Sequence, residues 1–460
     1  MATPASNQQA AGQSAADVHT LDTAILLPTA PVFAEEQPPQ SASSAPTIDC
    51  IGPLTPVGGV PLCLRTVLTL QRAGITNVII LSGAEEDSLK RLLTHDPRMV
   101  AVLRWMPLRE FPLDDPRTWE ALGQDVRGAG LVVGAHAVFS RALIEQLRQQ
   151  VQDEGGRRVL VPIWPGDKAS RAEVPQMMVV PASFLNGAAW RLGTARRGTP
   201  LHQIRAHAAA EGQLTIFPLN PESAQWCQAV GSSGGIEEVE RRLLHTPKGA
   251  YDGVIDAYFN RKVAKRFTRL FMKAGWSPNA ITMLSLSVGF LAAGCFARGT
   301  YAAGVVGALL FQLSAIIDCC DGDVARLTFQ ESQFGERLDL IGDNVVHMAI
   351  FGALGWAGYL NGGGALALTL GLLAMIGNGL SLWMVTRVKE RDRQRGWTNP
   401  VQAAQSTFIL KNMASRDFSI LVLLFALLNL LGVFLWLAAI GSNVFWVMTA
   451  WITRSPSIRA

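Results

Sequence analysis

Four aspartates, Asp318, Asp321, Asp339 and Asp343, stand at helical spacings inside the most apolar part of this chain, the segment from residue 276 to residue 452. A carboxylate at membrane depth is costly, so it requires a partner, a cation or a function. Asp318 and Asp321 are three residues apart and therefore share one face of a helix. The same holds for Asp339 and Asp343, which are four residues apart. The spacing predicts two acidic helix faces.

A polar segment, residues 327–338, joins these faces and is long enough to turn the chain back. The four carboxylates can then converge near one membrane surface, where they would repel each other unless a cation lay between them. Carboxylate oxygens are ligands for hard ions, so the pattern predicts one or two Mg²⁺, Mn²⁺ or Ca²⁺ ions. Arg326 adds a planar donor suited to phosphate. Snorkelling at helix ends would explain a single aspartate but not the whole set.

The order and spacing of eight residues resemble the signature of the CDP-alcohol phosphotransferase (phosphatidyltransferase) family. They are Asp318, Asp321, Gly322, Ala325, Arg326, Gly335, Asp339 and Asp343. The resemblance covers about residues 250–452. It includes Ser277-Pro278-Asn279-Ala-Ile-Thr282, which is similar to the start of the first hydrophobic helix in that family.

The resemblance implies a membrane enzyme that transfers a substituted phosphate from a CDP-alcohol to an acceptor alcohol and releases CMP. Such a reaction belongs to phospholipid or phosphodiester synthesis. Asp318, Asp321 and Asp339 would then hold metal, with Mg²⁺ favoured by phosphate chemistry. Asp343 would also reach the metal, and its main role would be that of the general base on the acceptor hydroxyl.

The resemblance also implies a binding site for the CDP group. Its residues would be Asp318, Asp321, Gly322, Ala325, Arg326, Gly335, Asn279 and Thr282. Lys411 and Arg416 lie where the family often places acceptor contacts, and they would suit a phosphorylated alcohol such as inositol phosphate. These two residues are equally well interpreted as ordinary positive charge that flanks a membrane span. Homodimers are common in the family, so a homodimer among membrane lipids is expected, with no nucleic acid partner.

The apolar segment predicts an all-α domain of six transmembrane helices, each near the ~20 residues that cross a bilayer. The expected spans are about 278–297, 301–322, 338–360, 365–386, 417–431 and 433–452. Residues 253–275 mix apolar and basic side chains at helical spacing and predict an amphipathic juxtamembrane helix. The alternative is a linker helix that packs on protein.

Basic residues flank alternate ends of the expected spans. They are dense in residues 261–273, 387–395 and 411–416, whereas the opposite loops hold Arg298 at most. The positive-inside rule therefore predicts a multi-pass protein of the cell inner membrane, with both termini and the acidic site in the cytoplasm. The first twenty residues lack the basic and apolar regions of a signal peptide. A net charge of +4 adds little beyond attraction to anionic headgroups.

Residues 20–245 instead alternate short apolar runs with helical segments, which predicts a Rossmann-like α/β domain with a mostly parallel sheet. The candidate strands are Thr23–Pro28, Asn77–Ser82, Val100–Trp105, Leu131–Gly134, Arg158–Ile163, Met177–Pro181 and Leu214–Pro218. Candidate helices include Pro61–Ala73 and Ser140–Gln150.

This half resembles a sugar-phosphate nucleotidyltransferase domain at Gly52–Leu62, Gly74–Ser82 and Leu131–His136. It departs from that family at three catalytic positions. The first strand is followed by residues 29–36, which contain neither the Gly-rich phosphate loop nor its arginine. Gly52 stands in place of a lysine, and Ala135 in place of a metal-binding aspartate. The expectation is a degenerate cytoplasmic domain that has lost catalysis.

The order of the two halves is similar to fusions of inositol-phosphate cytidylyltransferase with di-inositol-phosphate synthase. The expected organisation is a disordered tail (1–20), the nucleotidyltransferase-like domain (21–245), a linker with the juxtamembrane helix (246–275), the transmembrane domain (276–452) and a cytoplasmic tail (453–460). Two alternatives stay open: a transporter with an intramembrane cation site, and a bifunctional enzyme with residual cytidylyltransferase activity.

Overall fold

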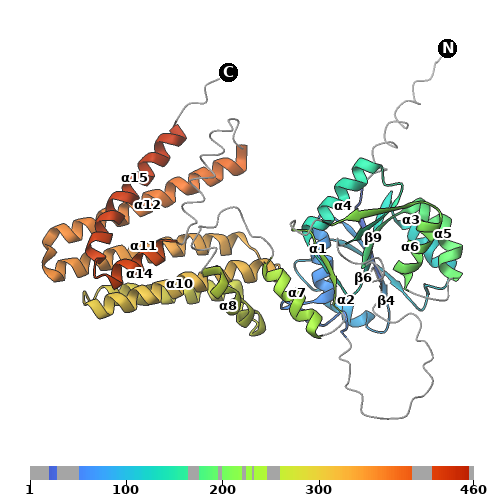
Figure 1. Ribbon diagram of the computed structural model, residues 1–460, viewed down its shortest axis with the longest axis horizontal. Coiled ribbons are helices and arrows are strands. Elements are labelled where there is room, and N and C mark those ends of the chain that lie inside the picture. The colour runs from blue at the N-terminus through green and yellow to red at the C-terminus, as the bar shows by residue number, and fades with distance from the viewer. Residues whose placement is uncertain are drawn as a thin grey trace, which may run out of the picture. The chain divides into compact units, whose positions relative to one another are not determined.

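The computed structural model describes residues 20–27, 51–163, 176–194, 199–219, 224–230, 233–245, 260–395 and 417–454. The chain divides into two compact units, Met1–Thr246 and Pro247–Ala460. The first is an α/β domain and the second is helical (Figure 1).

A seven-stranded sheet forms the centre of the first unit, with the strand order β10-β8-β9-β6-β1-β4-β5. The strands are β1 (Thr23–Leu27), β4 (Asn77–Ser82), β5 (Val102–Pro107), β6 (Ala129–Gly134), β8 (Val159–Ile163), β9 (Met177–Pro181) and β10 (Leu214–Pro218). Only β9 runs antiparallel to its neighbours, β6 and β8. The prediction of a mostly parallel sheet is confirmed. The third strand begins two residues later than expected, because Val100 and Ala101 instead donate backbone hydrogen bonds to the side chain of Gln71.

Helices cover both faces of this sheet, and the strand β1 is buried throughout for that reason. Its alternate residues Ile25 and Leu27 belong to a core that includes Trp119 of α3 and Leu185 of α5. The helices are α1 (Leu62–Arg72), α2 (Glu86–Thr94), α3 (Pro116–Asp125), α4 (Arg141–Glu154), α5 (Ala182–Thr194), α6 (Pro200–Ala210) and α7 (Ser233–His245). Figure 1 shows α1 and α4 on one side of the sheet and α3, α5 and α6 on the other.

Two short antiparallel ribbons complete the unit. They are β2 (Pro56–Val57) with β3 (Val60–Pro61), and β7 (Ala137–Phe139) with β11 (Cys227–Ala229). The buried Arg65 of α1 supports the first ribbon, since its Nε donates to the Val57 carbonyl at 2.9 Å and an Nη donates to the Gly58 carbonyl at 3.1 Å. Burial lowers the pKa of Arg65 to about 10.

The second unit consists of long apolar helices. They are α8 (Arg261–Lys273), α9 (Pro278–Phe296), α10 (Tyr301–Leu327), α11 (Gln333–Gly358), α12 (Gly364–Arg395), α14 (Asp417–Leu427) and α15 (Leu431–Arg454). Four stretches of the described residues are long and apolar enough to cross a membrane: Pro278–Phe296, Tyr301–Leu327, Gln333–Val388 and Leu431–Trp451. Phe418–Leu427 is a shorter apolar helix.

The third of these stretches contains two helices, because the backbone leaves helical geometry at Asn361 and Gly362 between α11 and α12. Six apolar helices therefore correspond to the six expected spans, although the number that crosses a bilayer remains a prediction. The expected span 417–431 is shorter in the structure. Asn429 adopts a left-handed backbone (φ 58°), which ends the helix and starts the turn into α15.

The helical unit turns apolar side chains outward and polar ones inward. Leu291, Leu366 and Ile440 are more than half exposed, whereas Asp318, Asp321 and Asp323 are buried. A surface this apolar requires a nonaqueous environment or a protein partner. The helix α8 packs on α10 through the buried residues Ala264 and Thr268 and turns Lys262, Arg266 and Arg269 outward.

Candidate active site

Three of the four predicted aspartates meet between α10 and α11. Asp318, Asp321 and Asp339 each contribute a carboxylate oxygen, and these oxygens lie within 4.8 Å of one another. Asp318 and Asp321 are almost completely buried, at 3% and 6% exposure. The turn that brings the helices together is short: α10 ends at Leu327 and α11 begins after Ser332, whose hydroxyl accepts a hydrogen bond from the Gly335 amide.

The donor set of this cluster fits a hard divalent cation. All three candidate ligands are carboxylates. Asp339 Oδ1 is buried and accepts no hydrogen bond from the described part of the chain. A buried anionic oxygen in that state is costly unless a cation or a ligand compensates it. The cluster therefore has both the chemistry and the unsatisfied atom that a divalent ion requires.

A residue from α9 positions one carboxylate. Thr282 donates from its hydroxyl to Asp321 Oδ2 and also to the carbonyl of Pro278. The amide of Gly322 donates to the other oxygen of Asp321. Ser277 caps α9 by accepting from the Ala280 amide, which fixes the end of the helix that carries Thr282. Both oxygens of Asp321 are thereby held before any ligand binds.

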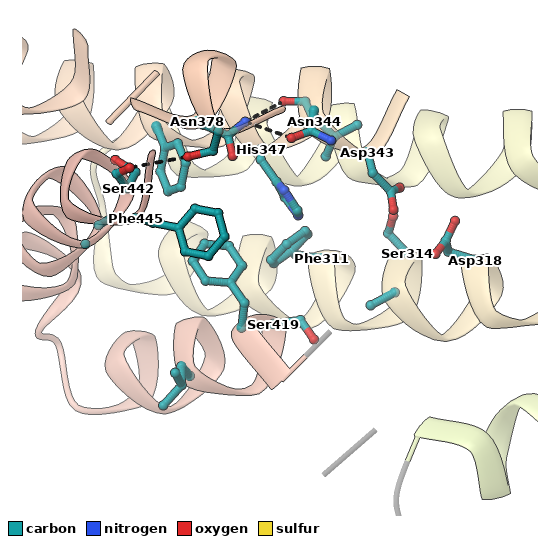
Figure 2. A pocket seen from close by; sticks show the side chains of 18 of the residues that line it. Phe311, Ser314, Asp318, Asp343, Asn344, His347, Asn378, Ser419, Ser442 and Phe445 are labelled. Atoms are coloured by element: carbon teal, nitrogen blue, oxygen red, sulfur yellow. Dashed lines mark hydrogen bonds between the residues drawn. The ribbon is translucent and has the colours of Figure 1, made fainter. Parts of the chain in front are cut away.

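Asp343 lies one helical turn beyond Asp339 and is not part of the three-carboxylate group. It lines a cavity of about 540 Å³ together with Asp318 and Asp339. Figure 2 shows Asp343 projecting from α11 towards Ser314 and Asp318 on α10. The structure thus brings Asp343 beside the carboxylate cluster without making it a fourth member.

Two glycines leave room beside the cluster. A Cβ atom at Gly322 would lie 3.3 Å from an Nη atom of Arg326, and one at Gly335 would lie 3.1 Å from Asn279 Oδ1. Arg326 donates to the buried Asp323 at 2.8 Å while 46% of its side chain stays exposed. Gly322 therefore lies beside Arg326 on α10, and Gly335 of α11 lies beside Asn279 of α9. Ala325 lies on the same helix as Arg326, and Lys411 and Arg416 fall outside the described residues.

Sequence reasoning overlooked two residues. Asp323 is the partner of Arg326, and its i,i+3 spacing was the available signal. His347 lies four residues after Asp343, on the face that also carries Asp339, and lines the same cavity. Its ring lies 5.7 Å from that of Phe311 and 5.3 Å from that of Phe418.

The first unit has a smaller cavity, of about 220 Å³, at the carboxyl ends of β1 and β4. Among the described residues that line it, Glu85 is the only charged one. Ala135 lines it as well, and Cys63 is buried there, which raises its pKa to about 12. The residues that follow β1, from 28 to 50, lie outside the described part of the chain. The described lining therefore offers no cation for a phosphate.

Comparison with known proteins assigns the helical part to a class. Residues 276–446 match the family model CDP-alcohol phosphatidyltransferase, so this part of the chain is a domain of that family. The matched residues contain the whole aspartate cluster and the predicted CDP-binding residues.

Three curated relatives are each named Bifunctional IPC transferase and DIPP synthase. The Aquifex aeolicus protein is 30% identical over 139 residues, which are 30% of this chain and 31% of the relative. The Archaeoglobus fulgidus protein is 33% identical over 135 residues (29% and 26%), and the Rubrobacter xylanophilus protein is 30% identical over 173 residues (38% and 37%). The chain therefore spans about a third of the length of these relatives.

Two solved structures are similar to different parts of the chain. A glucose-1-phosphate thymidylyltransferase from Bacillus anthracis has a TM-score of 0.35 and 14% identity, covering 48% of this chain and 94% of that one. The phosphatidylinositol phosphate synthase of Mycobacterium tuberculosis with CDP-DAG bound has a TM-score of 0.32 and 20% identity, covering 43% and 98%.

Proposed function

We propose that the chain is a multi-pass membrane transferase that moves a substituted phosphate from a CDP-alcohol to an acceptor alcohol and releases CMP. The observation that carries this proposal is the convergence of Asp318, Asp321 and Asp339 inside a CDP-alcohol phosphatidyltransferase domain. Because the curated relatives are named IPC transferase and DIPP synthase, a donor of the inositol-phosphate type is the first to test.

Asp343 acts as the general base. It accepts the proton of the acceptor hydroxyl, and the acceptor oxygen forms a bond to the β-phosphorus of the donor. The bond between that phosphorus and the bridging oxygen breaks, so CMP leaves with the bridging oxygen and its electron pair. A position beside the carboxylate cluster, on the wall of a cavity that can hold the acceptor, suits this role.

The chain's other residues bind and orient the donor. A divalent ion held by Asp318, Asp321 and Asp339, with Mg²⁺ as the first choice and Mn²⁺ or Ca²⁺ as alternatives, would neutralise charge on the pyrophosphate. Thr282 keeps Asp321 in place. Arg326 reaches the phosphates from its exposed position, and Gly322 and Gly335 allow close approach of the CMP group, beside Asn279 and Ala325.

The membrane arrangement follows the sequence prediction. Six apolar helices cross the inner membrane, and α8 lies on the cytoplasmic leaflet with its basic residues towards anionic headgroups. The termini and the acidic site face the cytoplasm, and the protein is a homodimer. Lys411 and Arg416 remain predicted acceptor contacts.

Metal binding coupled to CDP distinguishes this function from cation transport. The purified full-length protein is titrated with Mn²⁺, followed by electron paramagnetic resonance, with and without CDP. A transferase binds Mn²⁺ more tightly when CDP is present, since the two ligands share the site. An affinity for Mn²⁺ that does not change when CDP is added would favour the transporter.

A further inference from the structure

The cavity beside Asp343 has two chemically different ends. Near α10 and α11 it is lined by Asp318, Asp339 and Asp343. Its other end, here the aromatic arm, extends between α10, α11, α14 and α15. Six phenylalanines line this arm: Phe311, Phe351, Phe418, Phe425, Phe434 and Phe445. Figure 2 shows Phe445 towards the end away from Asp318, and His347 beside Phe311, whose rings lie 5.7 Å apart.

The described lining of the cavity includes neither lysine nor arginine. Its amides and hydroxyls are neutral, and several already bond within the protein. Asn378 donates to Asn344 at 3.3 Å, and Ser381 donates to the carbonyl of Gly377 at 2.8 Å. Along the aromatic arm a phosphorylated polyol would lose its hydration against phenylalanine rings, and no lysine or arginine of the described lining would compensate its charge. The lining favours an uncharged, mainly apolar molecule.

The position of the cavity assigns it to the acceptor rather than the donor. Of the residues predicted to bind CDP, only Asp318 lines it; Gly322, Arg326 and Asn279 do not. Asp343, the predicted base on the acceptor hydroxyl, does line it. The aromatic arm therefore continues from the acceptor side of the carboxylate cluster.

The arm also reaches the apolar outer surface of the domain. Leu421 of α14 and Leu437 of α15 both line the cavity, and they are 46% and 55% exposed. Their neighbours on α15, Ile440 and Val444, are exposed as well. A molecule dissolved in the hydrocarbon of a bilayer could pass between these helices without crossing water.

We propose that the aromatic arm holds the hydrocarbon chain of an uncharged lipid alcohol, the acceptor, with its hydroxyl at Asp343. This inference rests on the proposed transferase function and specifies its acceptor class. The balance of the step is unchanged: the lipid hydroxyl gives its proton to Asp343, its oxygen bonds to the β-phosphorus, and CMP leaves.

Two glycines of α15 provide a matched test. Gly441 lines the cavity, and a Cβ atom added there would meet nothing within 4 Å. Gly432 lies on the same helix with equally open space, and it does not line the cavity. The series Gly441→Ala, Gly441→Leu and Gly441→Phe fills the arm in steps. Gly432→Phe adds the largest side chain elsewhere, so it controls for effects on folding.

The measurement is CMP release by full-length protein in mixed micelles. The donors are CDP-inositol, CDP-glycerol and CDP-diacylglycerol; the acceptors are 1,2-dioctanoylglycerol and inositol 1-phosphate. We expect KM for dioctanoylglycerol to rise along the Gly441 series, by about tenfold for Gly441→Phe, or ~1.4 kcal/mol. The KM of the donor and the Gly432→Phe variant should not change.

Three results would overturn the inference. One is turnover with inositol 1-phosphate alone that Gly441→Phe leaves intact. Another is an equal effect of the Gly441 and Gly432 variants. The third is a rise in KM for CDP-diacylglycerol only, which would place donor chains in the arm.

A binding measurement separates failure of the inference from failure of the proposed function. A diacylglycerol with a diazirine in one acyl chain is photolysed with the protein, and the labelled peptides are mapped. Labelling of α14 and α15 that Gly441→Phe removes and Gly432→Phe preserves supports an apolar occupant, whether or not CMP forms. Equal labelling of both variants counts against it. Absence of CMP with every substrate pair would instead overturn the transferase.

Discussion

At the scale of single residues, the site depends on how firmly each carboxylate is held. Asp321 receives hydrogen bonds at both oxygens, from Thr282 and from the Gly322 amide. Asp339 instead keeps a buried oxygen without a hydrogen bond from the described residues. Asp321 is therefore oriented before a ligand binds, whereas Asp339 has an oxygen available to a ligand.

Loss of the Thr282 hydroxyl should weaken metal binding. In Thr282→Val the side chain keeps its shape but no longer orients Asp321, and supporting hydrogen bonds of this kind typically contribute ~10–100-fold to metal affinity. Titration with Mn²⁺ measures the change. Ser287→Ala on the same helix is the control, because that hydroxyl bonds only to the Met283 carbonyl among the described residues. Equal affinity in Thr282→Val and wild type would show that the Thr282 hydroxyl does not support a metal ligand.

Arg326 should affect nucleotide binding rather than folding. Its guanidinium is half exposed beside Gly322, and a charge-assisted hydrogen bond to phosphate contributes ~1.5–3 kcal/mol. We therefore expect Arg326→Ala to raise the Kd for CDP at least about tenfold by calorimetry. Arg298→Ala, beyond the other end of α9, should bind CDP normally. Retention of CDP affinity in Arg326→Ala would remove this residue from the proposed site.

At the scale of elements, close helix packing positions the acidic faces. Gly355 of α11 and Gly371 of α12 meet so closely that a Cβ atom at Gly371 would lie 3.0 Å from the Gly355 Cα. Small residues allow this approach between helices in membranes. The α11 segment held in this way also carries Asp339, Asp343 and His347.

A larger side chain at this contact should destabilise the helical unit. Gly371→Leu forces α11 and α12 apart, and overpacking of this kind costs ~1–3 kcal/mol. The apparent melting temperature in detergent should fall. Gly294→Leu on α9 is the matched control, since a Cβ atom there meets nothing within 4 Å. If both variants melted at the wild-type temperature, α11 and α12 would not pack as closely at Gly371 as described.

The sequence was sufficient to predict those elements whose signal is local. Short apolar runs located the strands Asn77–Ser82, Met177–Pro181 and Leu214–Pro218 at the bounds they have in the structure. Spacing also predicted that Asp318, Asp321, Asp339 and Asp343 converge, and the first three do so in the structure. The aromatic arm had no such signal, because it combines residues of four helices whose packing depends on contacts such as Gly355 with Gly371. For the same reason the separation of Asp343 from the cluster was visible only in three dimensions.

At the scale of the whole molecule, one unit carries the described acidic site and the other an α/β sheet. The described lining of the smaller cavity in the α/β unit includes Glu85 and Ala135 and contains no lysine or arginine. Loss of catalysis in this unit stays a prediction from the sequence, and under that prediction another enzyme supplies the CDP-alcohol.

The full-length protein should not consume CTP. Incubated with CTP, Mg²⁺ and inositol 1-phosphate, the Asp343→Asn variant should release no pyrophosphate above a blank. This variant is chosen because the membrane site cannot then consume any CDP-alcohol formed. Pyrophosphate release by the Asp343→Asn variant would indicate an active cytidylyltransferase in the first unit. The protein would then be a bifunctional enzyme.

The transferase itself is tested most directly by CMP release from the purified protein. With Mg²⁺, CDP-inositol, CDP-glycerol or CDP-diacylglycerol as donor, and a panel of lipid and water-soluble alcohols, we predict release with at least one pair. Asp343→Asn should lower the rate by at least ~10²-fold, as expected for loss of a general base, and should still bind CDP. Equal rates in wild type and Asp343→Asn, or no binding of CDP by either protein, would contradict the account.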